Sequence, residues 1–289
     1  MALLLGIDGG GTSCRAALAT ASGEIVGRGR GGPANIMTDL DGALASITAA
    51  AAAAFRDAGL DVSGIADVRA ALGLAGTNVG GYKAALLKRL PFAKSVVESD
   101  ALIALEGALG EHDGAIAILG TGSIFMAREA GRPRTIGGWG FVLSDLGGGA
   151  RLGRDLLQET LLAHDDIRPP SPATRAVMER FGGDAREISK FGAASKPADF
   201  GMLAPLVFEH ADDGDAVAAR ILATSAQAID EALDALKLNP GSRLCLLGGL
   251  APLWARHLAE RHRERLHAPL SDALGGAVSM AVRHFGGKR

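Results

Sequence analysis

Short apolar runs alternate with longer amphipathic stretches along the first part of the chain. Compact apolar runs are typical of buried strands, and apolar residues that recur every three or four positions are typical of amphipathic helices. Asp39 and Gly59 flank one amphipathic stretch as an N-cap and a stop signal, and Ser22-Gly23 predicts a turn. The first half is therefore predicted to contain strands at 2–8, 14–19 and 24–30, a helix at 40–58, a strand at 68–74, a helix at 79–90, a strand at 95–98 and a helix at 101–109.

The second half begins with the same order of patterns. It predicts strands at 115–119, 124–128 and 134–136, a helix at 150–163, several further helices with a long one at 215–236, a strand at 243–247, and helices at 251–266 and 271–285. A three-strand meander followed by alternating helix and strand thus occurs twice. This repetition predicts a structural duplication with a boundary near 110–114, while the proline-rich stretch 168–172 predicts a stiff loop inside the second half.

Each meander has a glycine turn directly after its first strand. Asp8 is followed by Gly9-Gly10-Gly11-Thr12, and the strand at 115–119 by Gly120-Thr121-Gly122-Ser123. Glycine allows positive φ and close approach to a ligand, so successive N–H groups can converge on an anion. A flexible hairpin would explain one such turn, but two in the same setting favour a nucleotide held between two halves. The chain has neither a P-loop motif nor a G-x-G-x-x-G that opens a helix after a strand.

Composition narrows the classes of function. With 289 residues, 48% of them apolar and 21% charged, the chain suits an ordinary globular protein with two domains. The net charge of −2 and the lack of a basic run argue against a nucleic-acid surface. No apolar stretch has the roughly 18 residues that a membrane helix needs. Met1 leads into a strand without a signal-peptide pattern, so a cytoplasmic location is expected.

Cysteine and histidine give no metal-site pattern. Cys14 and Cys245 lie in strand patterns and are interpreted as small core residues, since two thiols cannot complete a four-ligand site. His257, His262 and His267 lie on or near a predicted helix without matching acidic partners, so surface or capping roles are expected.

Several polar residues at the strand ends could carry chemistry. Asp8 could hold Mg²⁺, directly or through water. Thr12 and Thr121 could donate to phosphate oxygens, or their hydroxyls could bond their own backbone. Asp100 follows the strand at 95–98 and begins a helix, so it is either a helix N-cap or a carboxylate that accepts a hydroxyl proton in phosphoryl transfer. These alternatives stay open.

Further candidates lie in loops. The amide of Asn35, in a Pro-constrained loop, suits contact with neighbouring hydroxyls, and Asp145 lies in the glycine-dense run 137–149 before a helix. That run could instead be a structural loop with a helix cap, and Trp139 within it is the kind of residue found more often in a core than under a sugar. Gly248-Gly249 could let a flat base lie against the backbone, or form only a tight turn.

Together these motifs resemble those of the superfamily of sugar kinases, actin and heat-shock chaperones. Asp8-Gly9-Gly10-Gly11-Thr12, Gly120-Thr121-Gly122-Ser123 and Gly248-Gly249 resemble its two phosphate motifs and its adenosine motif. Within it, the runs 6–16, 34–37 and 167–169 look like the BadF-type family, which includes N-acetylglucosamine kinases and bacterial glucosamine kinases. The resemblance extends over nearly the whole chain and in order.

The resemblance implies an α/β fold of two ribonuclease-H-like (actin-like ATPase) lobes, with a nucleotide cleft between them. The expected lobes are residues 1–112 and 113–289, and the last helix is a candidate to pack back on the first. ATP would be bound by Gly9, Gly10, Gly11, Thr12, Gly120, Thr121, Gly122, Gly248 and Gly249, with Mg²⁺ at Asp8. The sugar site would be lined by Asn35, Asp100, Gly138, Trp139 and Asp145, with Asp100 as the base. Leu146 departs from the Glu or Gln common in relatives.

The resemblance implies phosphorylation of the 6-hydroxyl of glucosamine, with N-acetylglucosamine as the alternative substrate. A reductase-activating ATPase is a remote alternative, because its iron–sulfur cluster needs cysteine thiolates. A non-catalytic sugar sensor is another, but repressor relatives carry an added N-terminal DNA-binding region, whereas a strand begins at Ala2 here. The expected partner is a small amino sugar, with no nucleic acid and no membrane; the oligomeric state, including a homodimer, is left open.

Overall fold

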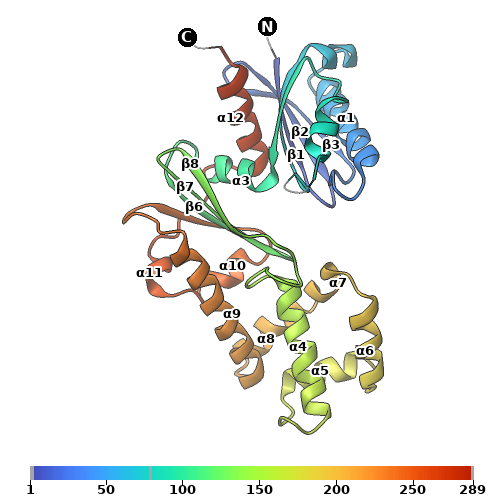
Figure 1. Ribbon diagram of the computed structural model, residues 1–289, viewed down its shortest axis with the longest axis vertical. Helices are drawn as coiled ribbons and strands as arrows, with labels where there is room; N and C mark the ends of the chain where they lie inside the picture. Colours follow the sequence, from blue (N-terminus) through green and yellow to red (C-terminus); the bar gives the residue numbers. More distant parts are fainter. Residues whose placement is uncertain (1–2, 78–79, 288–289) are drawn as a thin grey trace. The chain divides into compact units, whose positions relative to one another are not determined.

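The computed structural model describes residues 3–77 and 80–287 and contains two compact units (Figure 1). The first unit comprises Met1–Asp113 and Ala268–Arg289, and the second comprises Gly114–His267. Ala2 and Val79, the first residues of an expected strand and an expected helix, lie outside the described residues. Within the described residues, no helix is both long enough and apolar enough to cross a membrane.

The first unit is built on a five-stranded sheet. Its strands lie in the order β3-β2-β1-β4-β5, with the first three antiparallel and β1, β4 and β5 parallel. The strands expected from the apolar runs are confirmed, and their described ends differ from the expected ones by at most one residue. Their bounds are β1 (Leu3–Gly9), β2 (Cys14–Thr20), β3 (Ile25–Gly31), β4 (Arg69–Leu74) and β5 (Lys94–Ser99).

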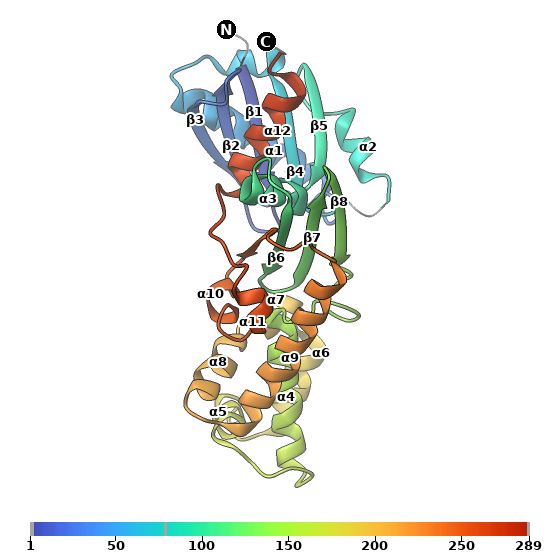
Figure 2. The ribbon, with the colours of Figure 1, turned by 90° about the vertical axis from the view of Figure 1, so that its left-hand side faces the viewer.

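Helices cover both faces of this sheet, because residues alternate between the two faces along each strand. Leu5 and Ile7 pack in one cluster with α1, and Leu4 packs in another with Ile103 of α3 and Ala277 of α12. Figure 2 shows α12 lying along the sheet. The helices of this unit are α1 (Leu40–Asp57), a 3₁₀ helix (Val62–Asp67), α2 (Tyr82–Leu87), α3 (Asp100–Leu109) and α12 (Ala273–Phe285).

Local capping signals account for several helix ends. The Asp39 carboxylate accepts the Gly42 N–H at the start of α1, as the sequence predicts. Asp272 does the same for α12 by accepting the Gly275 N–H. The 3₁₀ helix was not expected, and α2 is shorter than the helix expected at 79–90.

The second unit repeats the same arrangement with four strands. Its sheet has the order β8-β7-β6-β9, in which β6 pairs antiparallel with β7 and parallel with β9. This order matches β3-β2-β1-β4 of the first unit, so the duplication expected from the sequence is confirmed. The strands are β6 (Gly114–Leu119), β7 (Ser123–Glu129), β8 (Arg132–Gly137) and β9 (Arg243–Leu247).

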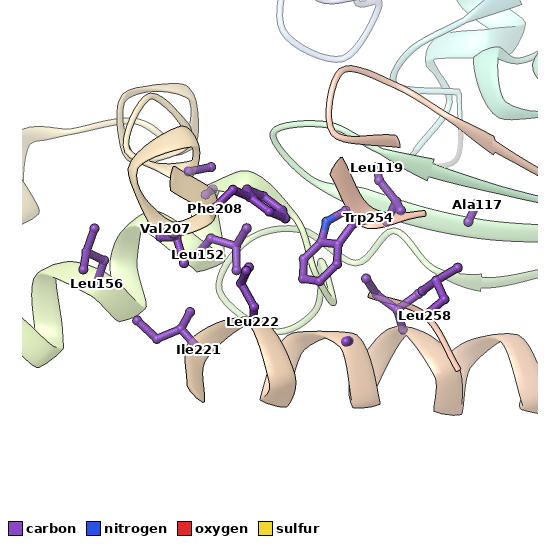
Figure 3. Packing of buried hydrophobic residues seen from close by; sticks show 14 of the residues in the cluster. Ala117, Leu119, Leu152, Leu156, Val207, Phe208, Ile221, Leu222, Trp254 and Leu258 are labelled. Atoms are coloured by element: carbon purple, nitrogen blue, oxygen red, sulfur yellow. The ribbon is translucent and has the colours of Figure 1, made fainter. Parts of the chain in front are cut away.

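A helical layer packs against the second sheet. Trp254 is fully buried; its ring lies edge-on to that of Phe208, and its indole N–H donates to the Gly147 carbonyl at 2.9 Å. Figure 3 shows Trp254 among the surrounding aliphatic side chains. The helices are α4 (Gly149–His164), α5 (Pro172–Arg180), α6 (Ala185–Ala194), α7 (Pro197–Gly201), α8 (Ala204–Asp212), α9 (Ala216–Ala235), α10 (Ala251–Trp254) and α11 (Glu260–Arg263).

The expectation of one helix at 251–266 is wrong. The segment forms two short helices, α10 and α11, because the Ala259 N–H donates to the Asp230 carboxylate of α9 instead of continuing a helical ladder. The expected surface role of His262 is also wrong. Its side chain is only 4% exposed, and Nε2 lies 3.1 Å from Asp234 Oδ1 and 3.8 Å from Asp230 Oδ1.

The contact between α3 and α12 yields a prediction about stability. A Cβ at Gly276 would collide with the Ile103 carbonyl oxygen, whereas a Cβ at Gly192, in α6, would meet no described atom within 4 Å. We expect Gly276→Ala to destabilise the protein by roughly 1–3 kcal/mol or more through overpacking. Gly192→Ala should instead stabilise it by about 0.5–1 kcal/mol, because alanine favours helix. Urea unfolding measures both; equal shifts in the same direction would contradict the close packing.

Candidate functional site

The first glycine turn closes the hairpin between β1 and β2. Gly9 is required by the fold, since a Cβ there would lie 2.5 Å from Leu74 Cδ2. Gly10 and Gly11 have no such requirement: neither has positive φ, and an added Cβ would meet only the Ser13 carbonyl oxygen at 3.8 Å or no described atom within 4 Å. The protein thus has room for side chains at Gly10 and Gly11, yet both residues are glycine. A turn without side chains is suited to a ligand that packs on the backbone.

Asp8 lies at the end of β1, opposite Arg15 on β2. Its Oδ2 accepts from Arg15 Nε at 3.1 Å and from Nη2 at 2.5 Å. Arg15 Nη1 also donates to Asp272 Oδ2 at 2.7 Å, which ties the hairpin to the start of α12. Arg15 is not among the residues expected from the sequence, although the register of a hairpin that turns after Asp8 places it across from this carboxylate.

The loop that carries Asn35 is bonded to the glycine turn. The Ala34 N–H donates to the Gly10 carbonyl at 2.9 Å, and the Ile36 N–H donates to the Ala75 carbonyl at 3.1 Å. The Asn35 Oδ1 accepts the Met37 N–H at 3.0 Å, so its amide nitrogen is the group left to donate to a ligand. Asn35 is therefore held beside the turn by backbone bonds on both sides.

Asp100 is the first residue of α3 and not its cap. The cap is Ser99, whose hydroxyl accepts the Leu102 N–H at 3.1 Å, so the N-cap alternative for Asp100 is wrong. The pKa of Asp100 is shifted upward, although the residue keeps an exposed surface. Crowding by neighbouring atoms raises it, the Ala101 N–H, 2.8 Å from Oδ1, lowers it, and the charge of Asp8 raises it. A carboxyl with a raised pKa is a better proton acceptor than an ordinary aspartate.

In the second unit, the turn Gly120–Gly122 is fixed against the start of α4. The Gly149 N–H donates to the Gly120 carbonyl at 2.8 Å, and the Ala150 N–H to the Thr121 carbonyl at 2.9 Å. The threonine side chains of both turns are exposed. In the part of the chain that the structure describes, neither the Thr12 nor the Thr121 hydroxyl bonds a protein group, so the alternative in which they bond their own backbone is wrong.

The carboxylate of Asp145 packs against this second turn. It is 8% exposed, has a left-handed backbone with φ of 59°, and accepts the Ser123 N–H. A Cβ at Gly122 would lie 2.6 Å from its Oδ2, so the turn packs directly on the carboxylate. Burial raises the pKa of Asp145, against the Ser123 N–H and the charge of Arg151, which lower it. Asp145 does not cap α4; Gly148 occupies that position.

The other candidates of the second unit lie on either side of this turn. Gly248 and Gly249 follow β9, and the Leu250 N–H donates to the carbonyl of Leu119, which precedes the turn. Gly138 has positive φ in the loop after β8. Trp139, next to it, is 81% exposed, so the interpretation of this residue as core is wrong.

The structure thus assembles two groups of candidate residues, one in each unit. In the first, Asp8, the glycine turn, Asn35 and Asp100 follow the carboxyl ends of β1, β4 and β5 or are bonded to them, where ligands of parallel sheets bind. In the second, Gly120–Gly122, Asp145 and Gly248–Gly249 gather in the same way beyond β6 and β9.

These residues fit a magnesium ion that arrives with a nucleotide. No group of three His, Cys, Asp or Glu side chains within residues 3–77 and 80–287 could hold a metal by itself. Mg²⁺ in nucleotide sites takes one or two carboxylates, with phosphate oxygens and waters as its other ligands. Asp8 would hold such an ion: Arg15 binds its Oδ2, and no other described residue bonds its Oδ1.

The duplicated sheets, each with a glycine turn after its first strand, define an α/β protein of two ribonuclease-H-like units. The family model of the BadF/BadG/BcrA/BcrD ATPases matches residues 5–268, and the chain belongs to this family.

Individual relatives agree with this assignment. The chain is 38% identical to glucosamine kinase of Vibrio cholerae over 96% of its own length and 95% of that protein. Its structure resembles that of a candidate N-acetylglucosamine kinase from Chromobacterium violaceum, with a TM-score of 0.88, 32% identity, and coverage of 98% and 99% of the two chains. A ROK family glucokinase from Streptomyces griseus shares the fold, with a TM-score of 0.54, 20% identity, and coverage of 96% and 98%.

The buried position of Asp145 yields a second prediction. Asp145→Ala should destabilise the protein by roughly 2–4 kcal/mol, because it leaves the Ser123 N–H unpaired and places alanine at positive φ. Asp145→Asn keeps an acceptor and tolerates that backbone.

The raised pKa of Asp145 predicts how the stability of the asparagine variant, relative to the wild type, changes with pH. Because the pKa of Asp145 is raised in the folded protein, its ionisation costs stability as pH rises through that pKa. Asp145→Asn should therefore be at least as stable as the wild type at pH 7, with the difference shrinking toward pH 4. Urea unfolding at both pH values measures this, and equal losses in the Ala and Asn variants would refute the proposed support.

Proposed function

We propose that this protein is an ATP-dependent amino-sugar kinase that transfers the γ-phosphoryl group of ATP to the 6-hydroxyl of glucosamine. The observation that carries this proposal is the position of Asp100, a carboxylate with a raised pKa that is not needed as a cap and lies in the unit that holds the first glycine turn. The 38% identity to a glucosamine kinase over nearly the whole chain supports the choice of substrate.

Asp100 is proposed as the general base. Phosphoryl transfer to an alcohol requires that the hydroxyl proton leave as the new P–O bond forms, and an aspartate is the usual acceptor in kinases. The raised pKa makes its carboxylate a stronger proton acceptor than that of an ordinary aspartate. The nearby charge of Asp8 adds to this effect by disfavouring ionisation of Asp100.

The two glycine turns are proposed to bind the phosphates of ATP. Backbone N–H groups and the hydroxyls of Thr12 and Thr121 are donors suited to phosphate oxygens, and the protein itself engages neither hydroxyl in its described part. Mg²⁺, held through Asp8, would neutralise charge on the β- and γ-phosphates. Gly248 and Gly249 are proposed to lie against the adenosine moiety.

Polar and aromatic residues are proposed to contact the sugar. Asn35 offers its amide N–H₂ to sugar hydroxyls, and Trp139, next to Gly138, offers an exposed ring to the apolar face of the pyranose. Asp145 is proposed to act near the sugar chiefly by fixing the turn that it supports. N-acetylglucosamine stays the second candidate substrate, because the fold is also that of a candidate N-acetylglucosamine kinase.

A reductase-activating ATPase is disfavoured by the cysteines. An iron–sulfur cluster is bound by thiolates, whereas Cys14 and Cys245 are both buried within strands. Burial and the charge of Asp8 raise the pKa of Cys14 to about 12, and burial raises that of Cys245. In both residues the thiolate that would bind iron is therefore disfavoured.

Thr121→Val tests the phosphate assignment. The change keeps the volume and removes a donor, so the KM for ATP should rise about tenfold or more, in line with a hydrogen bond to a charged group, while the KM for glucosamine changes little. Thr135→Val, an exposed threonine on β8, is the control and should behave like the wild type. Steady-state kinetics with both substrates varied decide it, and a loss confined to sugar binding would show that this turn does not bind ATP.

Asp100→Asn tests the base. We expect kcat to fall roughly 10²–10⁴-fold with ATP affinity nearly intact. In the wild type, kcat/KM should decline as pH falls through the raised pKa of Asp100, and this acid limb should be absent from the residual activity of the variant. Asp184→Asn, at a true N-cap of α6, is the control and should leave kcat unchanged.

Stability gives an independent readout for the same variant. Because ionisation of Asp100 is disfavoured in the folded protein, the asparagine variant should have an equal or higher Tm at pH 7. A folded Asp100→Asn protein with near-normal turnover would rule out Asp100 as the base.

A further inference from the structure

An open hollow of about 640 Å³ lies at the edge of the sheet in the first unit. It is bordered by β2, the edge strand β3, the last turn of α1 and the first turn of α12. Its volume lies within the range of small-molecule sites. The lining includes Arg15, Arg28, Arg30, Arg56, Asp57 and Leu274.

The strand register gathers three of these arginines on one face. Arg30 pairs with Arg15 across β3 and β2, and Arg28 pairs with Ala17, two positions along. Residues paired across antiparallel strands share a face, and so do residues two apart on one strand. Arg56 comes from the last turn of α1, where a cation is favoured by the helix dipole.

Only one of the four guanidinium groups is neutralised by a close carboxylate. Arg15 binds Asp8 and Asp272. In the described part of the chain, the guanidinium groups of Arg28, Arg30 and Arg56 form no hydrogen bond and no ion pair within 4 Å.

The two acidic residues near the hollow, Asp57 and Asp272, do not neutralise these arginines. Asp57 is used by the backbone, because its Oδ2 accepts the Arg28 N–H at 2.8 Å. Asp272 feels the charge of Arg28, but it binds Arg15 and caps α12. Three cations thus face one hollow in a protein whose net charge is −2.

We propose that this hollow is a second anion site, which binds a phosphorylated small molecule such as a sugar phosphate or a short polyphosphate. Guanidinium groups are planar forks that match phosphate oxygens in pairs, so three of them suit a group with two or more negative charges. The apolar side chain of Leu274 lies beside them and can contact a carbon skeleton.

This site is distinct from the glycine turns but is connected to one of them. Arg28, Arg30 and Arg56 are not among the residues proposed to bind ATP or the sugar. Arg15 is common to both, because it lines the hollow and also holds Asp8 at the end of β1. An anion in the hollow would therefore act on the guanidinium that positions Asp8.

Isothermal titration calorimetry on the full-length chain tests the proposal. Tripolyphosphate, glucosamine 6-phosphate and inorganic phosphate are titrated separately in the presence of saturating ADP, so that phosphate binding at the glycine turns is already satisfied. We expect one of the first two to bind, with an affinity that falls as salt rises from 50 to 300 mM because the ion pairs are screened. The anion of these two that binds more tightly shows whether the hollow takes a polyphosphate or a sugar phosphate.

The variants locate the binding. Arg28→Gln with Arg30→Gln should raise the Kd at least about tenfold. The matched control is Arg132→Gln with Arg134→Gln, which also removes two exposed arginines two positions apart on an edge strand, β8, and should leave the Kd unchanged. Arg56→Gln alone gives a second variant from a different element and should also weaken binding.

Three results would overturn the proposal. The first is the absence of binding by all three anions at low salt. The second is an equal loss of binding in the β3 and β8 double variants, which would indicate a general effect of charge. The third is a change of oligomeric state in light scattering with Arg28→Gln/Arg30→Gln but no change in anion binding, which would assign the hollow to a second copy of the chain. None of these readouts depends on kinase activity.

Discussion

The candidate chemistry depends on how the chain is held where the first strand of each sheet ends. In the first unit, the carbonyls of Gly9 and Gly10 accept the N–H groups of Ala75 and Ala34, so the turn, the loop of Asn35 and the end of β4 form one bonded edge. In the second unit, Leu119, Gly120 and Thr121 accept in the same way from the chain after β9 and from the start of α4. These bonds satisfy the carbonyls and fix each turn against the neighbouring segments of its unit.

Each unit keeps a carboxylate with a raised pKa at some cost in stability. Asp100 is less easily ionised than a free aspartate because of lost water and the nearby Asp8. Asp145 is buried, carries a raised pKa and has a left-handed backbone. Groups of this kind are common at functional sites, where a perturbed pKa is useful and the surrounding fold supplies the stability to keep it.

Much of this protein could be predicted from local sequence. The strands follow from apolar runs, and the N-cap at Asp39 follows from a side chain that bonds its own helix. The glycine turns are local as well, because Asp8 and the residues after it belong to one hairpin. The duplication was visible for the same reason, since each half repeats its own meander without reference to the other.

What the sequence left open depends on contacts between distant residues. Asp100 and Ser99 are equally good caps by residue type, and only the backbone geometry at the start of α3 assigns that role to Ser99. The break between α10 and α11 requires Asp230, from another helix, to accept the Ala259 N–H. The burial of Asp145 and the exposure of Trp139 likewise depend on how distant segments pack. Sequence by itself determined the elements and the turns, because these are set by neighbours along the chain; tertiary structure decided which side chains are buried, paired or free, because those properties are set by neighbours in space.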